Sequence, residues 1–243
     1  MEAGGDAVTR ARLSLSTLRN LPAEVGRPAY DPGRIGVGVV HLGPGAFHRV
    51  HQADYLDRLL ASDSRWGIAE VSLRSPGLRD ALLPQDGLYT LAEVETGAKY
   101  RVVGSLREMW VAAENPMRLL ERLQDPALKT VTLTVTEKGY CLAPDGRLDH
   151  QHPDIQRDLL TPQSPVSTPG LLVAMLARRK SGGTPPPVIL SCDNLSDNGK
   201  RLRGAVVDFA NAVDTDLARW IAAEVAFPCT MVDSITPATT DGL

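Results

Sequence analysis

The fold is decided by the stretch Ile35-Gly36-Val37-Gly38-Val39-Val40-His41-Leu42-Gly43-Pro44-Gly45-Ala46-Phe47-His48. Its first part, Ile35 to Leu42, is an apolar, valine-rich run of the kind found in strands buried within a parallel sheet. Beyond the glycines, apolar residues recur at helical spacing from Phe47 to Leu60. The sequence therefore predicts a strand, a tight glycine turn and a helix in direct succession.

This turn has features of one that binds the diphosphate of a dinucleotide. Gly43 allows a tight turn, Gly45 lets the backbone approach a diphosphate closely, and Ala46 and Phe47 open a helix with unpaired N–H groups. The third glycine of the G-x-G-x-x-G pattern is missing, because His48 occupies that position. A G-x-G pair also occurs in ordinary turns, so the spacing alone leaves both interpretations open.

The rest of the chain alternates between strand and helix patterns. We expect further strands at 66–73, 129–136 and 188–191, a hairpin formed by 88–94 and 100–103, and helices at 117–123, 170–179, 199–213 and 215–226. The start of the helix at 117–123 is placed by Asn115-Pro116, a favourable N-cap followed by proline at the first helical position. Strands separated by helices predict an α/β fold with a largely parallel sheet. Residues 1–34 are expected to form an arm, and residues 35–243 the domain.

Composition excludes several classes of protein. The chain has 243 residues, 43% of them hydrophobic, and 26 basic against 29 acidic side chains give a net charge of −3. This balance lacks the basic footprint of a nucleic-acid binder, and no apolar run approaches the roughly 18 residues of a membrane span. The N-terminal residues do not resemble a secretory signal. Three cysteines without a C-x-x-C pair disfavour disulfides and a zinc site, so we expect a cytoplasmic protein.

The second predicted strand bears on the choice of cofactor. Dinucleotide-binding domains place an acid at its end, roughly 20 residues after the glycines, to bind the ribose hydroxyls. Glu70 lies 25 positions after Gly45 but inside the predicted strand, and the strand end carries Arg74. Arg74 either meets a 2′-phosphate or is simply solvated, so the choice between NAD and NADP stays open.

Five blocks of the sequence resemble, in order, the mannitol dehydrogenase and fructuronate reductase family of polyol-specific long-chain dehydrogenases. The first is the stretch from His41 to Gln52, which reads on from the glycines as Phe47-His48-Arg49-Val50-His51-Gln52. The others are Gln85-Asp86-Gly87-Leu88-Tyr89-Thr90, Thr134-Val135-Thr136-Glu137-Lys138-Gly139-Tyr140, Ser191-Cys192-Asp193-Asn194-Leu195 with Asn198-Gly199, and Phe227-Pro228-Cys229-Thr230-Met231-Val232-Asp233. Lys138 is the residue that favours the fructuronate reductase branch.

The resemblance implies a Rossmann-type domain with a doubly wound, mostly parallel sheet and an added hairpin, which binds NAD(H). Enzymes of this family interconvert sugar alcohols or hexonates with ketoses or hexuronates, without zinc. Asn194 is then a donor to the substrate oxygen, Asp233 lines the substrate pocket, and Glu137 is a further catalytic candidate. Together with the glycine turn and the end of the second strand, this gives Gly43, Gly45, Ala46, Phe47, Arg74 and Asn194 as the positions expected to contact the cofactor.

The family also has a base that takes the hydroxyl proton. It is a lysine in the motif Lys-x4-Asn-x2-His, carried by a mostly helical second domain. None of the five lysines of this chain has an asparagine five residues further on, and Ser234 stands where the family has arginine after Asp233. We therefore expect that the helical catalytic domain is missing from this chain, and that the chain alone binds cofactor but turns over little.

Other interpretations accompany these expectations. Without the resemblance, Asn194 beside Asp193 would be a turn former, and Asp233 before Ser234 a helix or turn cap. His48 and His51 have the spacing of a metal pair, but no third ligand is evident. At the level of function, the alternatives are a catalytically inactive NAD-binding remnant or regulatory module, and a methyltransferase that uses S-adenosylmethionine.

Overall fold

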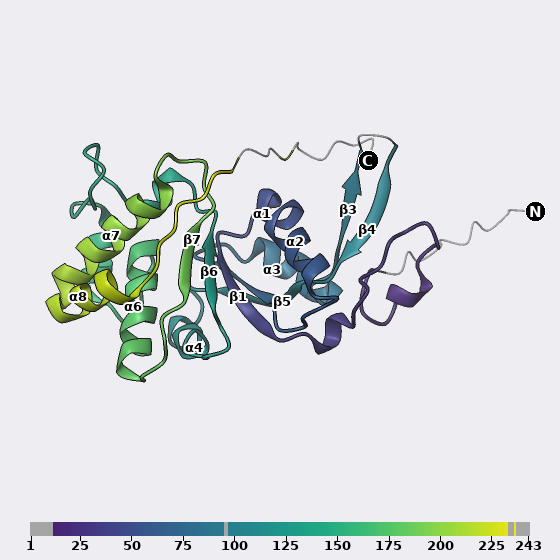
Figure 1. Cartoon of the computed structure of the whole chain (residues 1–243), viewed down its shortest axis with the longest axis horizontal. Helices are drawn as coiled ribbons and strands as arrows, with labels where there is room; N and C mark the ends of the chain where they lie inside the picture. The colour runs from purple at the N-terminus through teal and green to yellow at the C-terminus, as the bar shows by residue number, and fades with distance from the viewer. Residues whose placement is uncertain (1–11, 95–96, 233–235, 237–243) are drawn as a thin grey trace, which may run out of the picture.

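The computed structural model describes residues 12–94, 97–232 and 236. Its centre is a five-stranded parallel sheet in the order β5-β2-β1-β6-β7, accompanied by the antiparallel pair β3–β4 (Figure 1). The strands are β1 (Val37–Leu42), β2 (Gly67–Ser72), β3 (Tyr89–Glu93), β4 (Lys99–Val103), β5 (Leu106–Val111), β6 (Thr130–Leu133) and β7 (Val188–Ser191). Because β2 and β5 lie on one side of β1 and β6 and β7 on the other, the winding reverses at β1. The predicted doubly wound, Rossmann-type fold with an added hairpin is confirmed.

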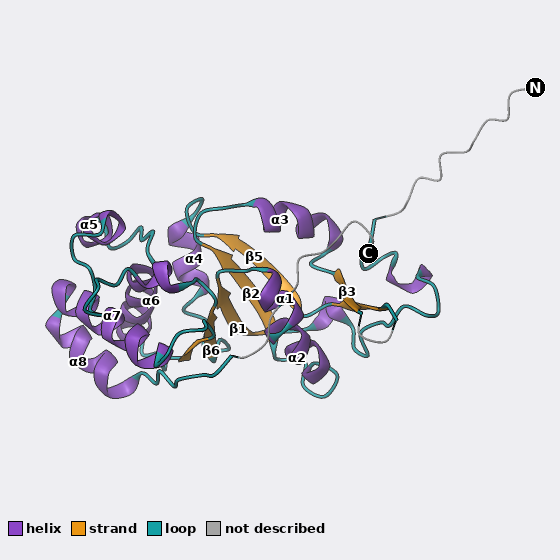
Figure 2. Ribbon diagram, turned by 90° about the horizontal axis from the view of Figure 1, so that it is seen from above, coloured by secondary structure: helices purple, strands orange, loops and turns teal. Residues whose placement is uncertain are grey.

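Helices cover both faces of the sheet, and Figure 2 shows the strands between α2 and the group α5 to α8. One apolar core joins Val40 and Leu42 of β1 to α4, α6 and α7, and a second joins Val39 to α2 and the hairpin. The helices are α1 (Ala46–Val50), α2 (Gln52–Leu59), α3 (Gly77–Leu82), α4 (Pro116–Arg122), α5 (Pro153–Leu160), α6 (Thr168–Ser181), α7 (Asn198–Val213) and α8 (Thr215–Glu224), with 3-10 turns η1 (Leu18–Asn20), η2 (Pro32–Arg34), η3 (Leu83–Gln85) and η4 (Glu137–Tyr140). Of the helices in the described ranges, none has the length and apolarity that crossing a membrane requires.

Several predicted elements differ from the observed ones. The helix expected from Phe47 to Leu60 is interrupted at His51, whose φ of −118° and ψ of −89° leave the helical region. The interruption lets His48 and Ala53, five positions apart, both be fully buried, whereas a continuous helix buries residues three or four apart. The strand expected to reach Thr136 ends at Leu133. Strand β5 and helices α3 and α5 were not predicted at all.

The segment from residue 12 to 34 contacts the hairpin. Gly26 pairs with Arg101 of β4 in a short parallel bridge, and the backbone N–H of Leu15 donates to Asp86 at 2.9 Å. The leucines of this segment, Leu13, Leu15, Leu18 and Leu21, are half-buried. The division of the chain at residue 34 stays a prediction.

One buried arginine holds the two loops that lead into β6 and β7. The side chain of Arg179 in α6 is 1% exposed, and its guanidinium donates to the carbonyl oxygens of Leu123, Asp125, Leu128 and Pro185 at 2.6 to 3.0 Å. These carbonyls lie in the connections that lead into β6 and β7. A planar fork of donors can satisfy several acceptors at once, which a lysine cannot do.

We expect Arg179→Lys to lower the free energy of unfolding by about 3 kcal/mol, because several buried carbonyls lose a charged donor. The neighbouring Arg178→Lys is the matched control and should change the stability by less than about 0.5 kcal/mol. Urea unfolding followed by circular dichroism measures both. Equal stability of the two variants would contradict this role of Arg179.

Candidate cofactor site

The glycine turn has two glycines with different physical roles. Gly43 adopts φ +84°, and a Cβ atom placed on it would lie 2.4 Å from the carbonyl oxygen of Thr134. Its own carbonyl accepts a hydrogen bond from the Thr134 hydroxyl at 2.8 Å. Gly45 is extended and caps α1, and a Cβ there would meet only the Gly43 oxygen, at 3.9 Å. The fold therefore requires glycine at position 43 but not at position 45.

A cleft of about 560 Å³ opens beside this turn. It lies at the carboxyl ends of β1, β2 and β6, where the strand order reverses, which is the usual ligand site of open α/β sheets. The walls are formed by the glycine turn, the loops after β2 and β6, and the first residues of α6. Residues lining it include Gly43, Pro44, Ser72, Arg74, Ser75, Thr134, Thr136, Lys138, His152, Asp154, Ser167 and Thr168.

The end of β2 carries the basic residue Arg74 and no acidic residue. Arg74 lines the cleft with its side chain 66% exposed, and it forms an ion pair with Asp154 at the start of α5. Glu70 lies within β2 and is 1% exposed, so it cannot reach a ribose in the cleft. An acid is thus present near the expected position, but it comes from Asp154, a residue far along the chain that the sequence analysis did not single out.

A polar framework centred on the half-buried Asp193 holds the ends of β6 and β7 together. The carboxylate of Asp193 accepts hydrogen bonds from the backbone N–H groups of Val135 and Thr136, at 3.2 and 2.9 Å, and from the Tyr140 hydroxyl at 2.7 Å. The N–H of Thr136 is thus held although this residue has φ +65° and ψ 164°, a region that glycine normally occupies. Burial raises the pKa of Tyr140, so its hydroxyl remains a donor.

The buried side chain of Asn198, at the start of α7, joins two segments that are far apart in the sequence. Its amide nitrogen donates to the carbonyl oxygens of Ser191, Asp193 and Thr230, and its amide oxygen accepts from the Thr230 N–H at 3.0 Å. The Ser191–Gly199 and Phe227–Val232 blocks therefore meet in space. Sequence reasoning missed these roles of Asp193, Tyr140 and Asn198, although all three lie in the quoted blocks.

The sequence-predicted catalytic candidates have different outcomes. Asn194 is exposed on the turn that Asp193 and Asn198 hold in place. Glu137 is exposed at the first position of η4, and its neighbours Thr136 and Lys138 line the cleft. Asp233 lies outside the described residues. The roles assigned to these three residues stay predictions, as do the cofactor contacts of Gly43, Gly45, Ala46, Phe47 and Arg74.

The histidines and cysteines lie in separate environments. His48 is buried and stacks on His41, whereas His51 stacks on Phe47 at a ring distance of 4.9 Å. Within the described ranges, no group of three or more histidine, cysteine or acidic side chains is placed to hold a metal ion. Burial raises the pKa values of Cys141 and Cys192 to about 11, so both thiols are protonated near neutral pH.

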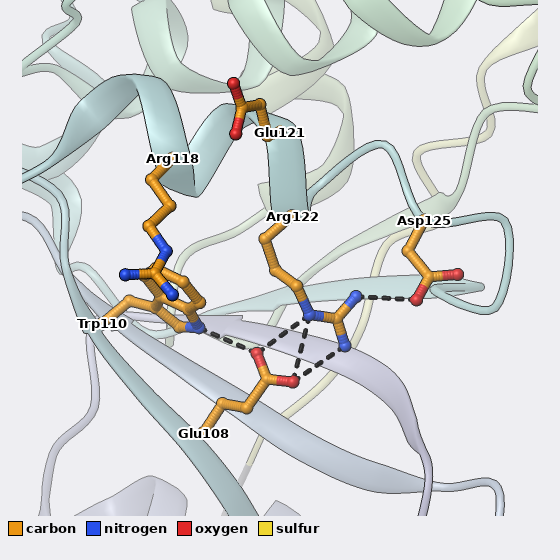
Figure 3. Close-up of a pocket in the computed structure, with 6 residues that line it drawn as sticks. All are labelled: Glu108, Trp110, Arg118, Glu121, Arg122 and Asp125. Atoms are coloured by element: carbon orange, nitrogen blue, oxygen red, sulfur yellow. Dashed lines mark hydrogen bonds and ion pairs between the residues drawn. The ribbon is translucent and has the colours of Figure 1, made fainter.

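A second hollow, of about 430 Å³, lies between the edge strand β5 and helix α4 (Figure 3). Three of its charged side chains pair with one another: Arg122 bonds to Glu108 at 3.0 Å and to Asp125 at 2.9 Å. The guanidinium of Arg118 lies 6.0 Å from the ring centre of Trp110. Because three of its charged side chains already pair with one another, and because it is separated from the strand reversal by β2, we regard the cleft beside Gly43 as the candidate site.

Comparison with known proteins identifies the family. The model described as the mannitol dehydrogenase Rossmann domain matches residues 37–243. This chain belongs to the mannitol dehydrogenase family. It is 44% identical over 229 residues to the D-mannonate oxidoreductase of Escherichia coli (strain K12), and 42% identical over 220 residues to the mannitol 2-dehydrogenase of Cereibacter sphaeroides.

These matches cover 91% and 88% of this chain but 46% of either relative, so the chain spans about half the length of the curated relatives. A solved structure of Pseudomonas fluorescens mannitol 2-dehydrogenase, a ternary complex with NAD and D-mannitol, superposes with a TM-score of 0.91 at 39% identity. The superposition covers 96% of this chain and 49% of that one. The family resemblance inferred from the five blocks is confirmed.

The different roles of the two glycines predict different effects on stability. We expect Gly43→Ala to lower the free energy of unfolding by about 1–3 kcal/mol or more, because alanine is strained at this φ and its methyl group overlaps the Thr134 carbonyl. Gly45→Ala should leave the stability unchanged, because open space surrounds the added methyl group. Urea unfolding measures both, and a Gly45→Ala variant as unstable as Gly43→Ala would contradict the assignment.

Proposed function

We propose that the chain binds NAD(H) in the cleft beside Gly43–Phe47 and serves hydride transfer between NAD(H) and a sugar alcohol and ketose, or a hexonate and hexuronate. The contrast between the two glycines supports this proposal most directly. Gly43 is needed by the protein itself, whereas Gly45 leaves room that the fold does not use. A diphosphate that approaches the backbone explains why the second glycine is present.

The residues around the cleft then have defined tasks. The N–H groups of the first turn of α1 have no acceptor within the helix, so they are available to the diphosphate oxygens. The amide of Asn194 donates to the substrate oxygen, where negative charge develops as the alcohol loses its proton. When bound there, NAD would supply the acceptor for the hydride of the substrate carbon. The general base for the hydroxyl proton is assigned to none of the described residues.

Arg74 is proposed to contact the ribose end of the cofactor. Its exposed guanidinium lies at the end of β2, where dinucleotide-binding domains recognise the ribose. The ion pair with Asp154 partly neutralises Arg74, which reduces its attraction for a 2′-phosphate and favours NAD over NADP. Asp154 also places carboxylate oxygens, acceptors for ribose hydroxyls, next to this position.

We expect the chain to bind NADH, and Gly45→Ala to weaken the binding at least ten-fold, because the added methyl group occupies the path of the diphosphate. Gly204→Ala in α7 is the matched control: its methyl group meets no atom within 4 Å and so is tolerated as well as the one at position 45, but it lies outside the cleft, so the affinity should not change. Titration of NADH fluorescence measures all three proteins. Equal affinities in the wild type and Gly45→Ala would contradict the proposed diphosphate site, and tighter binding of S-adenosylmethionine than of NADH would overturn the cofactor assignment.

A second candidate function is a catalytically inactive NAD-binding module. Because no lysine of the chain has the family's motif, we expect NADH binding with little or no oxidation when the chain is mixed with fructose or fructuronate. The loss of absorbance at 340 nm, the wavelength at which NADH absorbs, measures the turnover. Turnover at a rate typical of enzymes, about 1–1,000 per second, would exclude the inactive module and require a base among the residues of this chain.

A further inference from the structure

A row of polar side chains crosses the sheet face beneath the glycine turn. This face is otherwise apolar and packs Val39 and Ile68 against α2 and the hairpin. At one level of the sheet, however, Thr132 of β6, His41 of β1 and Glu70 of β2 are neighbours in register. All three are buried, with exposed fractions of 7%, 0% and 1%. Burying neighbouring polar groups costs free energy unless they form hydrogen bonds, so the partners of each of these side chains have to be accounted for.

The first two members of the row are fully hydrogen-bonded and lead to the turn itself. The ring nitrogens of His41 contact the hydroxyls of Thr132 and Thr134, at 2.8 and 2.9 Å. Because the Thr134 hydroxyl donates to the carbonyl of Gly43, it accepts from His41 Nε2. His41 is therefore a neutral donor at Nε2, and burial lowers its pKa in agreement with this. Its hydrogen bonds end on the glycine that shapes the turn.

The third member, Glu70, faces His48. The imidazole of His48, in α1, stacks on His41 with ring centres 3.4 Å apart and an angle of 8° between the planes. Its Nδ1 contacts Gln52 Oε1 at 3.2 Å, and its Nε2 lies 3.5 Å from Glu70 Oε1. Among the described residues, neither His48 Nε2 nor either oxygen of Glu70 has a hydrogen-bond partner. The contact between His48 and Glu70 is therefore the one that can satisfy these buried polar atoms.

Hydrogen-bond chemistry fixes the number of protons between them. Because Gln52 Oε1 is an acceptor, His48 Nδ1 must carry a proton, and Nε2 then has a lone pair when the ring is neutral. A favourable contact between Nε2 and Glu70 requires one shared proton. Burial raises the pKa of Glu70 to about 7 and lowers that of His48 to about 3, so the proton resides on Glu70.

Other charged or titratable groups surround the pair. The positive charge of Arg49 in α1 opposes the effect of burial on the pKa of Glu70. Arg49 and His51, the residue after α1, both disfavour a positive charge on His48. From β1, His41 stacks on His48, and from β3, Tyr89 lies near Glu70 and donates its hydroxyl to the carbonyl of Arg49. Burial raises the pKa of Tyr89, so it stays neutral and adds no charge to the cluster.

We propose that Glu70 and His48 form a one-proton positioning pair that holds α1 and the glycine turn ready for the cofactor, and that loss of the shared proton weakens cofactor binding. This inference rests on the proposed function for the site of binding. With the proton present, the space beneath the turn is neutral. Without it, a buried carboxylate faces a lone pair of His48 and lies beneath a turn that must receive a diphosphate, so both the packing of α1 and the attraction for the anion are reduced.

The pH dependence of NADH binding tests the pair. For the wild type, we expect the dissociation constant to rise by up to ten-fold per pH unit above about pH 7, since one proton is linked to binding. Glu70→Gln keeps a neutral donor toward His48 Nε2, so its affinity should stay close to the low-pH value up to pH 9. Glu121→Gln, on the exposed side of α4, is the matched control and should follow the wild type. A flat wild-type profile, or a Glu70→Gln profile parallel to it, would overturn the proposal.

Thermal unfolding of the unliganded chain tests the pair independently of NADH. The raised pKa of Glu70 stabilises the folded state at low pH, and this contribution is lost as the pH rises toward 7. His48 has the opposite effect. Its lowered pKa stabilises the folded state at high pH, and this stabilisation is lost as the pH falls below 6.5. Between the ordinary values of 4.5 and 6.5, folded and unfolded wild type each hold one proton on the two groups, so the pair adds no slope.

Of the pair, only His48 remains in Glu70→Gln. Below pH 6.5 the unfolded state of this variant therefore binds one proton more than its folded state. Its unfolding temperature, relative to Glu121→Gln, should therefore fall as the pH is lowered from 6.5 to 5. Parallel profiles for the two variants would show that no proton is shared, whatever the NADH result. If the wild type binds no NADH at any pH, the proposed function fails, and these profiles decide on the pair alone.

Discussion

The close passage of Gly43 past the carbonyl of Thr134 is the constraint on which the rest of the structure depends. Strands β1 and β6 are neighbours in the sheet, yet their crossovers leave toward opposite sides. The chain can turn out of β1 only if nothing larger than hydrogen occupies the Cα of Gly43. Because the two loops then diverge, a cleft opens between them, and the first turn of α1 lies beside it.

Polar side chains hold this edge of the sheet from within. Below β1 and β2, the row Thr132, His41 and Glu70 supports α1 through His48, and at β6 and β7 the Asp193 carboxylate supports the strained Thr136. The first group is buried, so its hydrogen bonds operate at low dielectric, where correct pairing is strongly favoured, whereas Asp193 is half-buried and Thr136 is exposed. The loops that form the cleft are thus tied to the sheet by side-chain hydrogen bonds to their backbones.

The sequence was most informative where local chemistry decides the structure. The apolar run before Gly43 correctly predicted β1. The Asn115 side chain caps α4 as predicted, accepting a hydrogen bond from the Arg118 N–H at 3.1 Å. Strand β5 was missed because Arg107 and Glu108 interrupt its apolar pattern, which an edge strand tolerates. The pairing of Glu70 with His48 and the framework around Asn198 were also missed. They join segments tens of residues apart, and no local pattern encodes such contacts.

The most direct test of the central claim is a two-dimensional amide NMR titration of the ¹⁵N-labelled chain with NADH. If the glycine turn holds the diphosphate, the amide signals of Gly45, Ala46 and Phe47 will show the largest shifts and will saturate with a single affinity. If these signals stay unchanged while those around Trp110 and Arg118 move, or if no signal moves at millimolar NADH, the cofactor does not bind where this account places it.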